Sequence, residues 1–78
     1  MIVKILSLKR GVEVLENVVS IKINSKKYNL LIMKNYTPII GDINGTIEIQ
    51  SENSSKKYEN INGYYLNIEN EFRLMLKE

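Results

Sequence analysis

Apolar residues recur at every second position in three segments of this chain, with mostly polar residues between them. The apolar positions are Val19, Ile21 and Ile23; Ile47 and Ile49; and Phe72, Leu74 and Leu76. Successive side chains of a β-strand point to opposite sides, so this period of two predicts strands that bury one face and expose the other. The chain is therefore expected to fold from short antiparallel strands.

Residues typical of turns separate these segments. Lys9-Arg10-Gly11 follows the first apolar stretch, Asn44-Gly45 precedes residues 46–50, and Asn62-Gly63 lies between residues 57–61 and 64–68. Asn-Gly pairs tolerate positive φ, so the sequence predicts a strand boundary at 44–45 and a tight hairpin at 62–63. The polar stretch 51–55 predicts a loop between two strands. This spacing of short strands predicts an all-β antiparallel β-sandwich.

The only proline follows Thr37 and interrupts strand-like sequence. Proline removes a backbone donor and holds the preceding residue extended, so the segment around Pro38 predicts a corner or an edge strand. With 78 residues, the chain is expected to form a single domain over residues 1–78.

Composition excludes several classes of function. The net charge is +2, and the basic pairs Lys9-Arg10, Lys26-Lys27 and Lys56-Lys57 are scattered among nine acids, which argues against nucleic-acid binding. Cysteine and histidine are absent, so the common zinc and copper ligands and the usual neutral-pH general base are missing. We expect no cofactor and no metal. The longest apolar run, Leu30 to Met33, is too short for a membrane span or a signal-peptide core. A cytoplasmic protein that does not enter the bilayer is expected.

No catalytic constellation is visible. The acids Glu13, Asp42, Glu48 and Glu59 fall in solvent-facing phases of predicted strands or in turns, with Asp42 itself predicted in a turn. The hydroxyl groups have no base at a catalytic spacing, so no acid–base pair or activated nucleophile emerges. The sequence indicates a protein that is not an enzyme by itself.

The segment Leu31-Ile32-Met33-Lys34-Asn35-Tyr36-Thr37-Pro38-Ile39 resembles the Gly-Ile/Val-Leu-Pro-Asn/Gly-His-Ala-Pro-Leu segment of the epsilon subunit of F-type ATP synthases. Neighbouring segments keep the family's order. They are residues 16–21 (Glu-X-Val-X-Ser-Val in the family), 45–49 (Gly-X-Ile/Leu-X-Ile/Val), 61–68 (Val-Ser-Gly-Gly-Phe-Leu-Glu-Val) and 73–76 (Val-Thr-Val-Leu). The resemblance thus covers nearly the whole chain and concerns the amino-terminal β-sandwich of that subunit.

The resemblance implies a non-catalytic central-stalk subunit that couples the gamma subunit to the c-ring rotor in proton- or sodium-driven ATP synthesis. Such a protein is peripheral on the inner face of the cell membrane through its complex. In isolation it is expected to be a monomer or a weak oligomer. The chain ends at Glu78, directly after the last predicted strand, so we expect the family's carboxy-terminal helical domain, which restrains ATP hydrolysis, to be absent.

The resemblance also implies two sets of partner contacts. The resemblance implies that the contacts with the rotor ring are made by Lys26, Lys27, Tyr28 and Asn29, where the family has a glycine-rich acidic turn. Two lysines there imply a ring with compensating acids, a protein that no longer meets a ring, or simply an exposed turn.

The resemblance implies that the contacts with the gamma subunit are made by Met33, Lys34 and Tyr36, with Tyr36 in place of the family's histidine. A corner tyrosine that packs on its own domain is the competing interpretation of Tyr36. A free-standing β-sandwich adaptor for protein binding, sharing the fold without the ATP synthase partners, is the alternative function.

Overall fold

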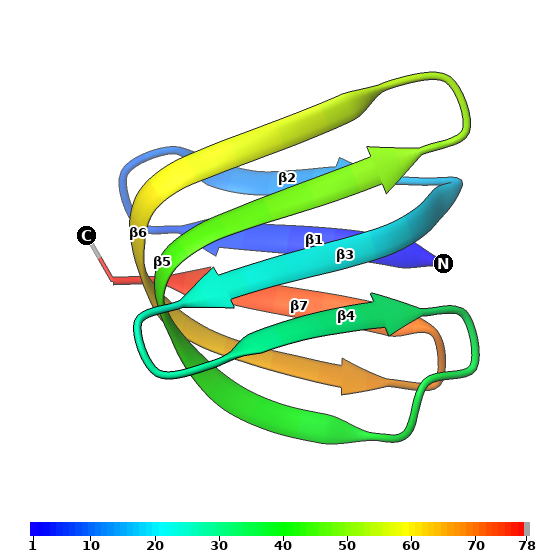
Figure 1. Ribbon diagram of the computed structural model, residues 1–78. Coiled ribbons are helices and arrows are strands. Elements are labelled where there is room, and N and C mark those ends of the chain that lie inside the picture. Colours follow the sequence, from blue (N-terminus) through cyan, green and yellow to red (C-terminus); the bar gives the residue numbers. More distant parts are fainter. Residues whose placement is uncertain (78) are drawn as a thin grey trace.

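The computed structural model describes residues 1–77 and consists of β-strands joined by turns and loops (Figure 1). The strands are β1 (Ile2–Ser7), β2 (Gly11–Leu15), β3 (Val18–Ser25), β4 (Asn29–Met33), β5 (Ile39–Ser51), β6 (Ser55–Ile68) and β7 (Glu71–Leu76). They hydrogen-bond in the order β2-β1-β7-β6-β5-β3-β4. Neighbours are antiparallel except β1 and β7, which run parallel.

Two strands are too long to remain straight in a molecule of this size. The 14 residues of β6 would span about 46 Å if extended, whereas the molecule measures 27 × 26 × 21 Å. Both β5 and β6 therefore curve at the same end of the molecule (Figure 1). Residues 39–44 of β5 pair with the second half of β6, and residues 45–50 pair with its first half.

This bend folds the sheet into two layers. The front sheet contains β4, β3, residues 45–51 of β5 and residues 55–61 of β6; the rear sheet contains the remaining halves of β5 and β6 together with β7, β1 and β2 (Figure 1). The predicted all-β sandwich is confirmed, with the parallel β1–β7 pair as an addition.

Both Asn-Gly pairs lie at the bend instead of at strand ends. The predicted boundary at 44–45 and the predicted hairpin at 62–63 are wrong, because both pairs are inside continuous strands. A Cβ on Gly45 would stand 2.2 Å from the carbonyl oxygen of Asn24, and one on Gly63 would stand 2.2 Å from that of Met75. Because glycine has no Cβ, these two positions let neighbouring strands approach closely, a common reason for glycine inside a strand.

Two bulges shift the alternation of side chains. One lies in β3, where the register changes between Val18 and Ser20. Val18 is consequently 3% exposed and Val19 is 43% exposed, so the prediction that Val19 faces inward is wrong. The other lies in β6 opposite Thr46, where Asn60 has a φ of 55°. A bulge inserts one residue and reverses the faces on one side of it.

The remaining connections follow local turn chemistry. Turns at residues 8–10 and 52–54 and the corner before Pro38 agree with the sequence. The hairpin between β6 and β7 turns instead at Glu69 and Asn70, whose φ values are 51° and 61°. Two successive residues with positive φ are the mark of a type I′ hairpin. Asp42, predicted in a turn, lies within β5.

The core lies between the two sheets. Its buried apolar residues are Val3, Ile5, Val18, Ile21, Ile23, Ile32, Ile43, Ile47, Ile49, Tyr65, Phe72 and Leu74. The rings of Tyr65 and Phe72 stack with centroids 5.4 Å apart. Asn67 is the polar exception, 2% exposed, and its Oδ1 has no hydrogen-bond partner among the described residues. An unpaired buried acceptor costs about 1–3 kcal/mol.

Candidate interaction surfaces

The outer face of the rear sheet carries an unbroken apolar row across four strands. Val12 of β2 pairs with Leu6 of β1, Leu6 with Met75 of β7, and Met75 with Tyr64 of β6. Directly paired residues share one face of a sheet, so these four side chains lie side by side. Val12 is 66% exposed and Tyr64 is 50% exposed.

A second row on the same face ends in apolar residues and has charges at its centre. It consists of Val14, Lys4, Arg73, Leu66 and Ile40. Lys4 Nζ lies 3.4 Å from Glu71 Oε1, and Arg73 Nε donates to Glu71 Oε2. The hydrogen bond from Arg73 lowers the pKa of Glu71. This ion cluster interrupts a face that is otherwise mainly apolar.

We call this surface the apolar face, defined by exposed or half-buried residues on the outer side of the rear sheet. They are Ile2, Leu6, Val12, Val14, Ile40, Tyr64, Leu66, Ile68 and Met75. Large contiguous apolar patches on protein surfaces mark interaction sites. The sequence hints at the apolar face where apolar residues are adjacent, as at Ile5-Leu6 and Tyr64-Tyr65-Leu66. In such a segment the side chains on both sides of the strand are apolar.

The outer face of the front sheet has the opposite character. Lys22 pairs with Glu48, and Glu48 pairs with Lys57, so charges of alternating sign cross three strands. Leu31 and Met33 of β4 and Val19 of β3 are exposed apolar residues of the front sheet. The two faces of the sandwich therefore differ, and the rear one is the better candidate for a protein interface.

The predicted gamma-side residues lie at a corner between β4 and β5. Met33 and Lys34 are exposed, whereas Tyr36 is half-buried and packs against the core. The Asn35 backbone N–H donates to Asn70 Oδ1 at 2.7 Å, and Asn70 Nδ2 donates to Asn35 Oδ1 at 3.1 Å. This tie holds the corner beside the turn that follows Ile68, at one end of the apolar face.

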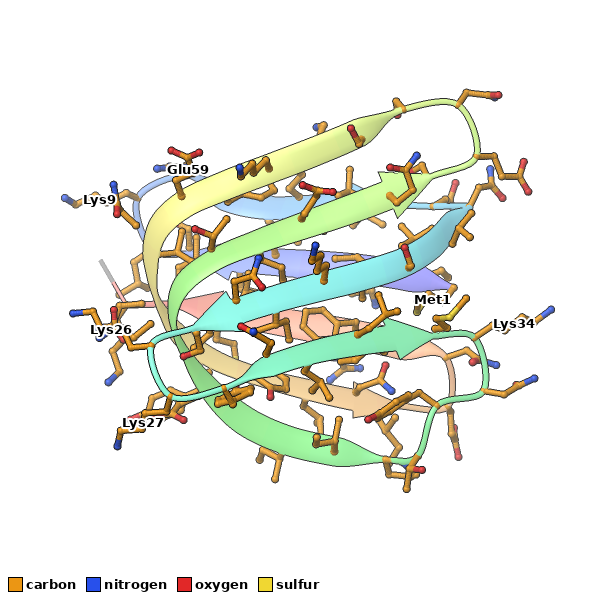
Figure 2. The ribbon with its side chains drawn as sticks, viewed as in Figure 1. Met1, Lys9, Lys26, Lys27, Lys34 and Glu59 are labelled. Carbon is orange, nitrogen blue, oxygen red and sulfur yellow. The ribbon has the colours of Figure 1, made fainter. Side chains whose placement is uncertain are left out.

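The predicted rotor-end residues lie at the opposite end of the molecule, where Lys26 and Lys27 project away from the sheets (Figure 2). The Lys26 backbone N–H donates to the Asn44 carbonyl oxygen at 3.0 Å, which attaches this turn to the bend. Asn29 is exposed at the start of β4. The structure thus separates the two predicted contact sets instead of bringing them together.

Tyr28 is turned toward the core instead of toward solvent. Its hydroxyl lies 2.7 Å from the Tyr65 hydroxyl and donates to the Asp42 carbonyl oxygen. Burial, followed by the hydrogen bond with Tyr28, raises the pKa of Tyr65. The tyrosine pair connects the β3–β4 turn to the rear sheet, which gives Tyr28 an internal packing role.

Glu13 pairs with the buried Ile5 and so lies on the inner face of the rear sheet, contrary to the predicted solvent-facing phase, but at this open edge its side chain is still 43% exposed. It accepts hydrogen bonds from Lys56 Nζ at 2.7 Å and from the Tyr58 hydroxyl at 2.9 Å. These bonds lower the pKa of Glu13, with the Lys56 bond as the largest cause. Burial and the bond to Glu13 raise the pKa of Tyr58 to about 12. The cluster joins the edge strand β2 of the rear sheet to β6 of the front sheet.

The lowered pKa of Glu13 predicts a contribution to stability that depends on pH. The ordinary value is 4.5, so this contribution is present above that pH and is lost as the pH falls through the lower folded-state value. We expect the difference in free energy of unfolding between the wild type and Glu13→Gln to shrink as the pH falls below 4.5. Urea unfolding between pH 3 and pH 7 measures it, with Glu52→Gln in an exposed loop as the control. A difference in free energy of unfolding that stays constant with pH would contradict an ionised Glu13–Lys56 pair in the folded protein.

Metal and membrane sites were sought among residues 1–77. No group of three or more carboxylate side chains is placed to hold a metal ion there. The described part of the chain also lacks a helix of the length and apolar character needed to cross a bilayer.

No known family profile matches this sequence, and no curated protein matches it significantly. The fold is similar to that of a chain in the cryo-EM structure of the central stalk and c-ring of the mitochondrial ATP synthase of Tetrahymena thermophila. The TM-score is 0.81 at 13% sequence identity, and the match covers 100% of this chain and 63% of that one. This chain therefore has a β-sandwich fold that also occurs in a chain of that central-stalk and c-ring structure.

Proposed function

We propose that this chain is a non-catalytic, epsilon-type central-stalk subunit of an F-type ATP synthase. In this role it joins the gamma subunit to the c-ring rotor during proton- or sodium-driven ATP synthesis. The observation that carries the proposal is an exposed apolar face on a sandwich whose fold occurs in a structure of the central stalk and c-ring of an ATP synthase. A chain that transmits torque needs one firm interface and one projecting end, and no reactive group.

The gamma subunit is the proposed occupant of the apolar face. The row Val12, Leu6, Met75 and Tyr64 supplies the central contacts, and aromatic and methionine side chains are enriched in such interface cores. The corner at Lys34 and Tyr36 adjoins this face and extends it, with Met33 on the neighbouring edge of the front sheet. Tyr36 acts there mainly by fixing the corner, because it packs on its own core.

The rotor end is the bend with its attached β3–β4 turn. Lys26, Lys27 and Asn29 are exposed there and are the proposed contacts, while Tyr28 supports them from inside. In this arrangement the protein is held on the inner side of the membrane by its partners and inserts nothing into the bilayer. It binds no nucleic acid, and alone it forms a monomer or a weak oligomer through the apolar face.

Calorimetric titration of the purified chain with the gamma subunit of the same organism tests the proposal. We expect a complex whose formation has a negative heat-capacity change, because apolar surface is buried. Lys34→Gln is expected to weaken it, whereas Lys22→Gln on the polar front face is the matched control. Absence of binding to gamma would overturn the stalk function.

A free-standing adaptor that binds another protein through the same face is the second candidate function. The basic β3–β4 turn favours it, because the family has an acidic turn at this place. The genes adjacent to this one separate the two candidates, since a stalk subunit is expected among genes for the other synthase subunits.

A further inference from the structure

The edge strand β4 directs a row of backbone hydrogen-bonding groups away from the sheet. It is the last strand in the sheet order and, within residues 1–77, pairs with β3 on one side only. The Ser25 N–H donates to the Tyr28 carbonyl oxygen at 2.8 Å, and every second residue after Tyr28 bonds to β3 in the same phase. The alternate residues of β4 therefore direct their N–H and C=O groups toward the free edge. They are Asn29, Leu31 and Met33, with Leu31 at the centre.

The other free edges of the sandwich are protected in ways that β4 is not. Residues 39–44 of β5 follow Pro38, and the Tyr28 hydroxyl donates to the Asp42 carbonyl oxygen on that edge. Residues 55–61 of β6 carry three charged side chains and a bulge, and β2 carries Glu13, whose carboxylate binds Lys56. Proteins use such features to stop an edge from pairing with another chain. The sequence of β4 is Asn-Leu-Leu-Ile-Met and its register with β3 is continuous, so this edge is open to strand addition.

The charges around β4 select the chemistry of the partner. Residues 25–38, which include β4 and the connections on both sides of it, contain three lysines and no acid. Lys26 and Lys27 lie at one end of β4, and Lys34 lies at the other (Figure 2). A second copy of this chain paired antiparallel to β4 would set these lysines against each other, and like charges in that position destabilise a sheet. An extended segment with carboxylates at its ends is attracted instead.

The side chains along this edge favour an apolar centre in that segment. Leu31 and Met33 are 52% and 50% exposed on the outer face of the front sheet. A hollow of about 500 Å³ lies on the same face, and Lys22, Asn29 and Leu31 are among the residues that line it. Directly opposite residues of paired strands share a face, so an added strand places every second side chain beside this apolar surface. Aliphatic residues suit those positions.

We propose that β4 binds an extended protein segment by strand addition to the front sheet. The segment has aliphatic residues at alternate positions and carboxylates at both ends. Backbone hydrogen bonds centred on Leu31 supply the affinity, and the side chains that reach Leu31 and Met33 supply the selectivity. This inference goes beyond the proposed stalk function and does not rest on it, because Leu31 lies outside the apolar face.

Fluorescence polarisation of the purified chain with a labelled synthetic peptide tests the proposal. The probe is Glu-Glu-Val-Thr-Val-Thr-Val-Glu-Glu, capped at both ends, and its counterpart has lysine in place of each glutamate. We expect the acidic peptide to bind at least about tenfold more tightly than the lysine peptide. N-methylation of the central valine removes a donor that faces β4 and is expected to reduce the affinity about tenfold. N-methylation of the next threonine removes a donor that faces away from β4 and should leave binding unchanged.

Substitutions in the protein separate backbone pairing from side-chain contact. Leu31→Pro removes the N–H that faces the free edge and keeps the bonds to β3, and proline is tolerated at such positions. Leu31→Ala removes the same side chain and keeps the N–H. We expect Leu31→Pro to bind the acidic peptide about tenfold more weakly than Leu31→Ala, with circular dichroism as the check on folding. Lys27→Gln is expected to weaken binding roughly threefold, whereas Lys9→Gln in the β1–β2 turn should not.

Several outcomes would overturn the proposal. They are no binding of the acidic peptide, equal binding of the acidic and lysine peptides, and equal binding of the parent peptide and the one methylated at the central valine. Light scattering tests the competing occupant, since a dimer that Leu31→Pro dissociates would assign this edge to a second copy of the chain. Leu31→Pro is expected to bind gamma as the wild type does, so failure of this inference leaves the stalk function standing.

Discussion

Replacement of Gly63 by alanine is expected to cause a large loss in the free energy of unfolding while most molecules stay folded without denaturant. The added Cβ would stand 2.2 Å from the Met75 carbonyl oxygen and 3.1 Å from its carbonyl carbon. Both atoms belong to the backbone of β7, so relief requires separating β6 from β7 where Gly63 pairs with Leu76. Such overpacking costs about 3 kcal/mol or more, against a total stability of roughly 4–12 kcal/mol for a chain of this length.

Gly11→Ala is the matched control for this change. Gly11 has a φ of +86°, and nothing lies within 4 Å of its ideal Cβ, so only backbone strain opposes alanine there. That strain costs about 1 kcal/mol. Urea unfolding followed by circular dichroism measures both variants. Equal losses at the two positions would show that the contact between β6 and β7 at the bend is not tight.

Polar substitution of the apolar face is expected to abolish most binding to gamma while the fold is retained. Ile40→Gln and Met75→Gln change side chains that are 76% and 40% exposed, so neither change creates a cavity in the core. Each is expected to reduce the affinity about tenfold, and the double variant about a hundredfold, because each puts a polar amide on apolar surface that the proposed interface buries. Calorimetry against gamma provides the measurement, with the unfolding midpoint as a check on folding.

Leu31→Gln provides the comparison on the other side of the molecule. Leu31 is 52% exposed on the outer face of the front sheet, which carries alternating charges. We expect its affinity for gamma to equal that of the wild type. A larger loss for Leu31→Gln than for Ile40→Gln would transfer the interface to the front sheet and refute the assignment of the apolar face.

Local patterns predicted the inner face of several strands and several turns. The alternations at residues 46–50 and 72–76 correctly placed Ile47, Ile49, Phe72 and Leu74 in the core. The pattern failed at Val19, because a bulge in β3 reverses the alternation and depends on how β3 pairs with β5. It also failed at the Asn-Gly pairs. Asn-Gly permits a tight turn, yet the same small, flexible pair also suits a bend where two strands approach closely.

The candidate surfaces were less predictable than the fold. The partner contacts carried over by resemblance remain predictions, and the structure adds that they lie at opposite ends of the molecule. The apolar face was not predicted, because apolar residues in both phases of a strand do not reveal which phase becomes the core. The position of Glu13 on the inner face was also not predicted. Its partners Lys56 and Tyr58 are more than 40 positions away along the chain, so no local pattern reveals them.

Residue types and short-range patterns were enough to predict that this chain forms strands, where several of its turns occur, and which common catalytic and metal-binding groups it lacks. These properties depend on residue type and on neighbours within a few positions. The three-dimensional fold was needed to show that β5 and β6 bend to build both sheets, that one outer face is mainly apolar, and that Lys9, Lys26 and Lys27 share one end. Those features arise from pairing between distant segments, in which sheet register and close packing of the backbone at Gly45 and Gly63 determine which side chains meet.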